Sequence, residues 1–249
     1  MLGETTLIED LRCSGALRLV FPRTSPQLTA IAVNAAGGLT SGDKFTLQAS
    51  AGHCSDLVLS TQAAERAYRA PYGPAMIETQ LEVAAGARLR WLPQELILFD
   101  GCDLSRRLRV NLDVDARLLL VEPLVFGRIA MGETLKSARL RDRVEIYRCG
   151  TPIYLDGMLF TGDVTDCLAR PAVAAGGRAI ASIVYVAPDA EGRRDLLRAS
   201  LPECAGVSLL QSDMLVLRLV AQDGFELRKA LLPTLQQLSD DTLPKTWRL

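Results

Sequence analysis

Short apolar stretches, separated by Gly, Asp, Asn or Pro, recur through the first two thirds of the chain. Several of them alternate apolar with polar residues, as half-buried strands do, and none is long enough to predict a helix. The pattern therefore predicts a β body over about residues 11–175. Its clearest strands are expected at residues 28–34, 56–62, 87–94, 116–123 and 144–148.

A unit made of a turn and a strand recurs within this β body. Leu57, Leu89 and Leu118 occupy equivalent places in the segments DLVLSTQAAE, RLRWLPQE and RLLLVEP, at spacings of 32 and 29 residues. Recurrence at this period predicts stacked layers of strands, as in a β-solenoid or a sandwich, because each layer covers the apolar face of its neighbour.

From about residue 178 onwards, strands are expected to alternate with helices. Residues 178–188 predict a buried strand, and Pro188 followed by Asp189 predicts the start of a helix that runs to about residue 201. Residues 206–221 predict a hairpin that turns at Ser212-Asp213. The core-facing side of the helix is expected to carry Leu196, Leu197 and Leu201.

A second helix is expected over residues 225–238, after Asp223-Gly224, with a bend at Pro233. The tail at 243–249 is apolar enough to dock on the body or on a partner. No linker-like run separates residues 176–249 from the β body, so residues 1–249 predict a single domain. The apolar positions of the second helix are Phe225, Leu227, Ala230, Leu231, Leu235 and Leu238.

Composition narrows the classes of function. The chain has 28 Lys and Arg against 29 Asp and Glu, a net charge of -1, which gives no electrostatic basis for binding nucleic acid. Its one histidine, His53, excludes a His-rich zinc site. Six scattered cysteines without a C-x2-C pair predict free thiols in a reducing compartment. No apolar run reaches the length of a membrane span, so a cytoplasmic protein without membrane contact is expected.

The glycine-rich segment NAAGGLTSGDKF, at residues 34–45, follows an apolar strand. The spacing of a phosphate-binding loop is absent, so the segment predicts a tight turn that presents Asp43. His53 lies beside Cys54 in a polar segment, and adjacent strand residues point to opposite faces, which favours a surface turn over a catalytic pair.

Acidic residues inside or beside apolar stretches are the most informative polar positions. A buried carboxylate is costly unless it is paired or binds a metal. One interpretation pairs each acid with a nearby arginine, Glu65 with Arg66 or Arg69 and Asp142 with Arg141 or Arg143. Another is a polar path through an apolar body. The acids are Glu65, Glu95, Asp100, Glu122, Glu133, Asp142 and Asp156.

Six ordered motifs resemble the UreD (UreH) family of urease accessory proteins from about residue 11 to the end. They are N-x-A-G-G-L-T-x-G-D at 34–43, T-Q-A-A-E-R-x-Y-R at 61–69, W-L-P-Q-E-x-I-L-F-D-G at 91–101, E-P-L-V-F-G-R-x-x-M-G-E at 122–133, R-D-R at 141–143 and L-P-x-x-W at 243–247. Ser41 departs from the family pattern, which has glycine there.

The resemblance implies a non-enzymatic metallochaperone. Its implied fold is mainly β, a β-helix-like stack of strand layers with two α-helices in the C-terminal third. Its implied partners are the accessory protein UreF, the GTPase UreG and apo-urease, to which nickel passes. Nickel in transit must bind weakly enough to leave, so spaced carboxylates, carbonyls and water are expected, with no permanent cofactor and no tight metal site.

The family's channel positions fall here on Asp43, Glu65, Glu122 and Asp156. Two other functions stay open, a docking scaffold without a nickel path and a hydrolase that acts through paired carboxylates. Six further residues lie in the matching blocks, where a structural role is equally compatible: Gln62, Glu95, Asp100, Arg128, Glu133 and Asp142.

Overall fold

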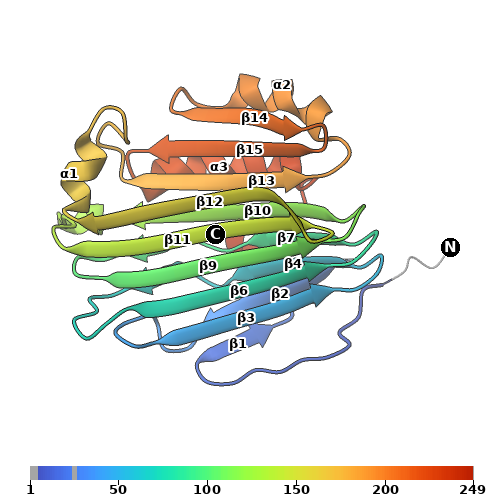
Figure 1. The fold of residues 1–249 in the computed structure, drawn as a ribbon, viewed down its shortest axis with the longest axis horizontal. Helices are drawn as coiled ribbons and strands as arrows, with labels where there is room; N and C mark the ends of the chain where they lie inside the picture. Colours follow the sequence, from blue (N-terminus) through green and yellow to red (C-terminus); the bar gives the residue numbers. More distant parts are fainter. Residues whose placement is uncertain (1–4, 24–26, 249) are drawn as a thin grey trace.

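Two β-sheets lie face to face in the computed structural model, which describes residues 5–23 and 27–248 (Figure 1). The first sheet runs in the order β1 (Leu17–Val20), β2 (Leu28–Asn34), β4 (Asp56–Thr61), β7 (Arg88–Leu92), β10 (Arg117–Phe126), β13 (Ala179–Val186), β15 (Met214–Ala221) and β14 (Ala205–Gln211). Beside β10 it also holds β8 (Leu96–Leu98), which pairs with β5 (Glu65–Ala67). The second sheet runs β12 (Thr151–Gly162), β11 (Ala138–Arg148), β9 (Asp103–Leu112), β6 (Ala75–Val83) and β3 (Lys44–Ala51).

Parallel strands stack in register in both sheets. Leu57 on β4 pairs with Leu89 on β7, which pairs with Leu118 on β10, so the predicted equivalence of these leucines is confirmed. Leu28 on β2 extends the row by one further layer. The predicted β-helix-like fold is therefore confirmed, and the five strands expected in the body correspond to β2, β4, β7, β10 and β11.

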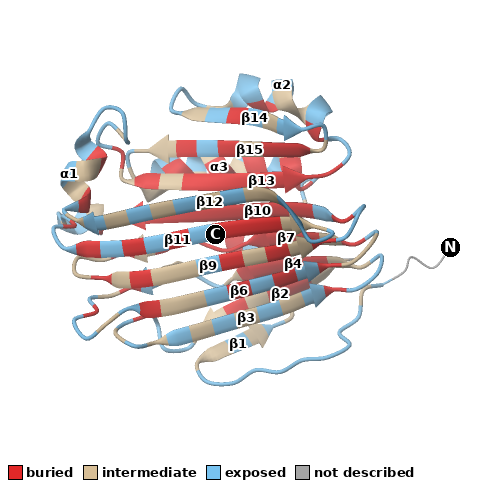
Figure 2. Ribbon diagram, viewed as in Figure 1, coloured by how far each residue is buried: buried red, intermediate tan, exposed pale blue. Residues whose placement is uncertain are grey.

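Apolar side chains fill the space between the sheets in two clusters. One gathers around Leu89, Leu118 and Val110, and the other around Leu98, Leu124 and Leu140. A third cluster lies on the outer face of the first sheet, under the C-terminal helices. Figure 2 shows β10 and β13 buried along almost their whole length, because these strands are covered on both faces.

Both predicted helices and the predicted hairpin are confirmed. The helices are α2 (Ala190–Ser200) and α3 (Gly224–Leu238), and the hairpin joins β14 to β15 across Ser212-Asp213. The side chain of Asp223 caps α3 by accepting a hydrogen bond from the Glu226 amide. A short helix, α1 (Val164–Ala169), and two 3-10 helices, η1 (Ile129–Met131) and η2 (Lys245–Trp247), were not predicted.

The predicted packing faces of the two helices are wrong at one residue each. Leu197 is buried but Leu196 is exposed, because the helix turns through about 100° between them and carries Leu196 beyond the edge of the buried face. Leu227 is buried while the Phe225 side chain is 74% exposed, because two residues of helix turn through about 200°.

The C-terminal tail docks on the body of the protein. Trp247 is fully buried in the outer apolar cluster, and its Nε1 donates a hydrogen bond to the carbonyl oxygen of Leu92 at 2.9 Å. The Arg228 guanidinium lies 5.1 Å from the centre of the Trp247 ring. The tail thus covers β7 on the face of the sheet opposite the second sheet.

Within the described part of the chain, we find no helix with the length and apolar character needed to span a bilayer.

We expect Trp247→Ala to lower the free energy of unfolding by about 3–5 kcal/mol, because it leaves a large cavity and removes the hydrogen bond from Nε1 to the Leu92 carbonyl oxygen. Urea denaturation followed by circular dichroism measures this value. Phe225→Ala is the matched control, an exposed aromatic residue expected to change stability by less than about 0.5 kcal/mol. Equal effects of the two substitutions would contradict the docking of the tail.

Candidate functional site

Three strands of the second sheet each place one charged side chain among inward-facing apolar ones. Arg106 lies two residues from Leu104 and from Leu108 on β9, so it shares their inward face. The same two-residue period turns Asp142 on β11 and Asp156 on β12 towards the first sheet. These charges therefore point into the space between the sheets.

The first sheet supplies matching polar residues at the same level. Glu122 on β10 pairs with Ser182 on β13, which pairs with Arg218 on β15. In the second sheet, Asp142 pairs with Arg106. We call these residues the polar layer, and it separates the two apolar clusters of the interior. Its members are Arg106, Glu122, Asp142, Asp156, Ser182 and Arg218.

Arg106 joins the two buried carboxylates of the polar layer. Its Nε and Nη2 donate hydrogen bonds to the two Asp142 carboxylate oxygens at 2.9 and 2.5 Å. Its Nη1 lies 2.5 Å from Glu122 Oε2, an ion pair without hydrogen-bond geometry. Trp91 Nε1 donates a hydrogen bond to the other oxygen of Glu122 at 2.6 Å. Asp142 thus pairs with an arginine on the next strand.

The expected pairing of Asp142 with Arg141 or Arg143 is therefore wrong. Both arginines flank Asp142 on β11, so their side chains leave the opposite face of the sheet, and both are exposed. Arg143 Nε instead lies 2.5 Å from Glu145 Oε1, and Glu145 also accepts hydrogen bonds from Arg107.

Burial and charge act against each other at this cluster. Burial raises the pKa of the Glu122 carboxyl above its usual value, although the Arg106 guanidinium opposes the shift. Burial by itself lowers the pKa of Arg106, but Asp142 and Glu122 together raise it above its usual value. Arg106 therefore stays charged, and the cluster depends on that charge because an unpaired buried carboxylate is strongly destabilising.

Asp156 lies at the outer side of the polar layer. It forms an ion pair with Arg218, and the Asp156 and Arg218 side chains are 25% and 45% exposed. Tyr154 Oη lies 3.5 Å from Arg218 Nη2, and burial raises the pKa of that phenol.

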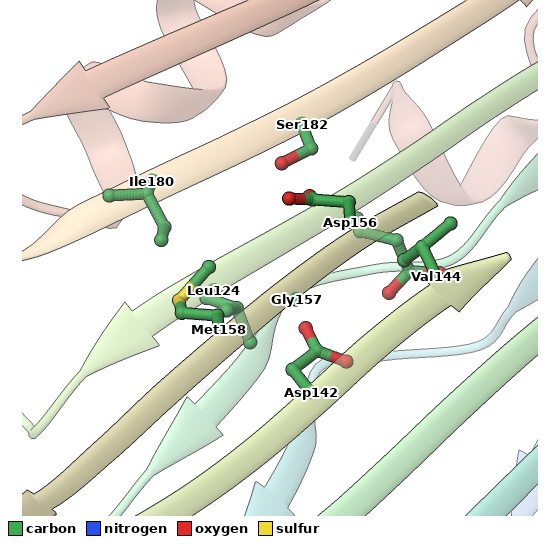
Figure 3. A pocket seen from close by; sticks show the side chains of 9 residues that line it. Leu124, Asp142, Val144, Asp156, Gly157, Met158, Ile180 and Ser182 are labelled. Atoms are coloured by element: carbon green, nitrogen blue, oxygen red, sulfur yellow. The ribbon is translucent and has the colours of Figure 1, made fainter. Parts of the chain in front are cut away.

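A small cavity opens among the carboxylates of the polar layer. Glu122, Asp142, Asp156 and Ser182 line it, and its volume of about 10 Å³ corresponds to about one water molecule. Figure 3 shows the Asp156 carboxylate turned towards Ser182, with Asp142 on the neighbouring strand. Throughout the described residues, no group of three or more His, Cys, Asp and Glu side chains is placed to hold a metal ion. The polar layer thus offers separate carboxylates and no closed cage.

Asp43 and Glu65 do not line this cavity. Asp43 Oδ2 accepts a hydrogen bond from the Thr40 amide at 2.8 Å, which closes the predicted glycine turn, and Ser41 Oγ accepts one from the Tyr72 amide at 2.9 Å. Glu65 accepts hydrogen bonds from Asn34 Nδ2 and from its neighbour's backbone amide, and no arginine side chain is hydrogen-bonded to it in the described structure. Burial raises the pKa of Glu65.

Asp100, Arg128 and Glu133 form a separate cluster that ties a loop to the end of the strand stack. Glu133 accepts hydrogen bonds from the Arg128 side chain and amide and from the Asp100 amide. Asp100 in turn accepts from the amides of Lys136 and Ser137 at 2.7 and 2.9 Å. These contacts organise backbone, which is a structural role.

The remaining candidates lie apart from the polar layer. Glu95 Oε1 is 3.2 Å from Arg228 Nη1, in contact with α3, and Gln62 is exposed. His53 is exposed beside Cys54, as expected for a surface turn. The predicted free thiols are confirmed for all six cysteines, each of which lies in the described part of the chain.

Arg106, Ser182 and Arg218 were not among the site residues predicted from the sequence. The sequence did contain a signal for Arg106. In DLSRRLRVNL at 103–112 apolar and polar residues alternate, and Arg106 stands at a position where the alternation predicts an inward-facing apolar residue. Ser182 and Arg218 are likewise polar residues inside otherwise apolar strands. Which residues they contact depends on the pairing of the strands, which the sequence did not reveal.

Comparison with known proteins identifies the class. A model of the UreD urease accessory protein family matches residues 2–248. The chain is 50% identical to the urease accessory protein UreD of Roseobacter denitrificans over 243 residues, which cover 97% of this chain and 89% of that protein. It is 46% identical to the UreD of Ruegeria pomeroyi over 251 residues, which cover 100% of this chain and 98% of that protein.

These matches place the molecule in the class of urease accessory proteins. Within that class, the chain belongs to the UreD family.

Acid should remove the contribution of Glu133 to stability. Hydrogen bonds from Arg128 lower the pKa of Glu133 to about 2, from an ordinary 4.5. Because the folded pKa is the lower one, the stabilisation is present above about pH 4.5 and is lost as the pH falls towards 2. We expect Glu133→Gln to cost about 1–2 kcal/mol at pH 7 and progressively less below pH 4.5, measured by urea unfolding at several pH values.

Glu203→Gln is the control for this pH series, since Glu203 is exposed and forms no ion pair in the described structure. A pH-independent difference between Glu133→Gln and the unsubstituted chain would contradict the assignment.

Proposed function

We propose that this chain is a metallochaperone of urease maturation that docks apo-urease and UreF-like and UreG-like accessory proteins and passes nickel along its polar layer. Membership of the UreD family supports the role in urease maturation. The observation that supports the nickel path is the row of carboxylates, Glu122, Asp142 and Asp156, that crosses an otherwise apolar interior.

The chemistry of these side chains suits transit. Carboxylate oxygens are weaker ligands for nickel than thiolate or imidazole, and single carboxylates spaced along a path allow an ion to bind and leave. Nickel is the cargo in this proposal, and the chain needs no resident cofactor. The proposed path does not include Asp43 and Glu65, whose carboxylates accept hydrogen bonds from the Thr40 amide and from Asn34 Nδ2. Six free thiols fit a reducing compartment, so we place this activity in the cytoplasm.

A hydrolase acting through these carboxylates is not favoured. The cavity between them has the volume of about one water molecule, which leaves no room for a sugar ring. Glu95, the other acid considered for such a role, is paired with Arg228.

A docking surface supports the scaffold part of the proposal. Leu155 and Leu159 on the outer face of β12 are 58% and 65% exposed. Figure 2 shows exposed segments along β12. Arg141 on β11 pairs with Leu159, and neither Arg139 nor Arg141 forms an ion pair within the described residues. This face suits a partner protein that presents acidic side chains around an apolar centre, because opposite charges orient the encounter and the leucines are desolvated on contact.

A scaffold without a nickel path is the second candidate, and this exposed surface is the observation that favours it. The two candidates differ in what substitutions inside the polar layer should do.

For the nickel path, we expect Glu122→Gln or Asp156→Asn to slow nickel-dependent urease activation by more than tenfold. Removing one charge from beside a divalent cation at 4 Å costs about 2 kcal/mol even at the dielectric constant of water. Activation is measured as urease activity against time after nickel is added to apo-urease with the accessory proteins.

Asp213→Asn is the matched control, because Asp213 forms a partly exposed ion pair with Arg148 at 2.7 Å, outside the cavity. Normal activation by Glu122→Gln and Asp156→Asn, together with intact complexes, would refute the nickel path and support the scaffold alone.

For the docking surface, we expect Leu159→Glu to weaken binding to apo-urease or to the UreF-like protein by about tenfold or more, since burial of a leucine contributes about 1.5–3 kcal/mol. Biolayer interferometry with each purified partner measures this change. Gln48→Glu, on the polar outer face of β3, places the same charge elsewhere on the sheet and should leave binding unchanged. Equal binding by both variants would exclude this face.

A further inference from the structure

The two arginines of the polar layer occupy the positions that a transported cation would need. Arg106 contacts both Glu122 and Asp142, and Arg218 contacts Asp156, so every carboxylate that lines the cavity already has a guanidinium partner. A metal ion and a guanidinium compete for the same carboxylate oxygens. In the form described here, a cation can therefore reach Asp156 only after Arg218 has left it.

The two arginines differ in how firmly they are held. Arg106 has an 11% exposed side chain and contacts two carboxylates at 2.5 Å, and removing one partner from such a buried cluster is strongly destabilising. Arg218 has one carboxylate partner and a 3.5 Å contact with Tyr154. An ion pair as exposed as this one contributes little to stability. Arg218 is thus the group that can leave at low cost.

The surroundings of Arg218 leave room for such a movement. Its neighbour on β14 is Gly206, which has open space where a side chain would stand. Directly paired residues of neighbouring strands project from the same face, so this space lies beside the Arg218 side chain. On its other side, Arg218 pairs with Ser182, which lines the cavity.

The charges also match a divalent cargo once Arg218 moves away. The three carboxylates of the cavity carry three formal negative charges, and Arg106 offsets one of them, which leaves -2. With Arg218 in place, the polar layer carries -1 and its outermost carboxylate is occupied.

We propose that Arg218 is the lock of the polar layer: its guanidinium closes the path at Asp156 and must swing away before nickel enters, while Arg106 remains as a fixed counter-charge. This inference rests on the proposed nickel path and names its regulation. Arg218 acts here as a positioning residue, because it controls access to Asp156 and is not itself a nickel ligand.

The test compares Arg218→Gln with Arg218→Lys in the full-length chain, at limiting nickel and with apo-urease and the accessory proteins present. We expect Arg218→Gln to raise the initial rate of urease activation by up to about fivefold, the factor equivalent to about 1 kcal/mol. Arg218→Lys keeps a charge that can pair with Asp156, and we expect a rate near that of the unsubstituted chain. Arg148→Gln opens the comparable pair with Asp213 and should not change the rate.

A second measurement uses the purified full-length chain with nickel chloride alone. We expect nickel to raise the thermal unfolding temperature of Arg218→Gln more than that of the unsubstituted chain, and this gain to disappear in the double variant Arg218→Gln/Asp156→Asn. Circular dichroism without nickel checks that every variant is folded.

The outcomes separate the lock from the nickel path. If Asp156→Asn slows activation while Arg218→Gln activates at or below the unsubstituted rate, the path stands and the lock is wrong. If Glu122→Gln and Asp156→Asn both activate urease normally, the nickel path is wrong, and the closing role of Arg218 is then wrong as well. A faster Arg218→Gln with a normal Arg218→Lys supports both.

Discussion

In-register stacking of parallel strands is the constraint on which the rest of this structure depends. Leu28, Leu57, Leu89 and Leu118 lie side by side on four successive strands of one sheet, where the hydrogen bonds between strands and the burial of equivalent side chains favour the same alignment. Because each layer repeats the level of the one before, side chains at equivalent positions meet at one height. Both apolar clusters of the interior follow from this arrangement, and the polar layer between them is completed by the antiparallel strands β12, β13 and β15.

A polar layer inside a protein opposes the hydrophobic effect that holds its neighbours. Here the cost is limited by pairing, since Arg106 engages Asp142 and Glu122, and Trp91 engages the remaining oxygen of Glu122. Replacing these residues by apolar ones of similar volume would be compatible with the fold. Stability alone therefore does not account for these charged residues, in keeping with the cation path proposed above. The inner cluster of Arg106, Glu122 and Asp142 is buried, whereas the outer pair of Asp156 and Arg218 is partly exposed.

Local pattern predicted the elements of the fold well and their packing faces less well. Strands β2, β4 and β7, the hairpin after Gln211 and the two long helices were expected from apolar periodicity and turn residues. Strand β11 was expected only from residue 144, since Arg139, Arg141 and Arg143 obscure its apolar positions. Leu196 and Phe225 were predicted on buried faces but are exposed, because the turn of the helix carries them away from their buried neighbours Leu197 and Leu227.

The sequence by itself determined the strand period, the two long helices and the motifs that carry the family resemblance, because these depend on neighbours along the chain. The tertiary structure decided which charges meet. Arg106 and Asp142 are 36 residues apart and Trp91 and Glu122 are 31 apart, so each contact depends on one strand lying beside another. The sequence also left open whether the tail docks on the body or on a partner. The hydrogen bond from Trp247 to Leu92, 155 residues away, shows that it docks on the body. Local pattern specifies the face from which a side chain leaves its strand, and only the stacking of strands specifies what it finds there.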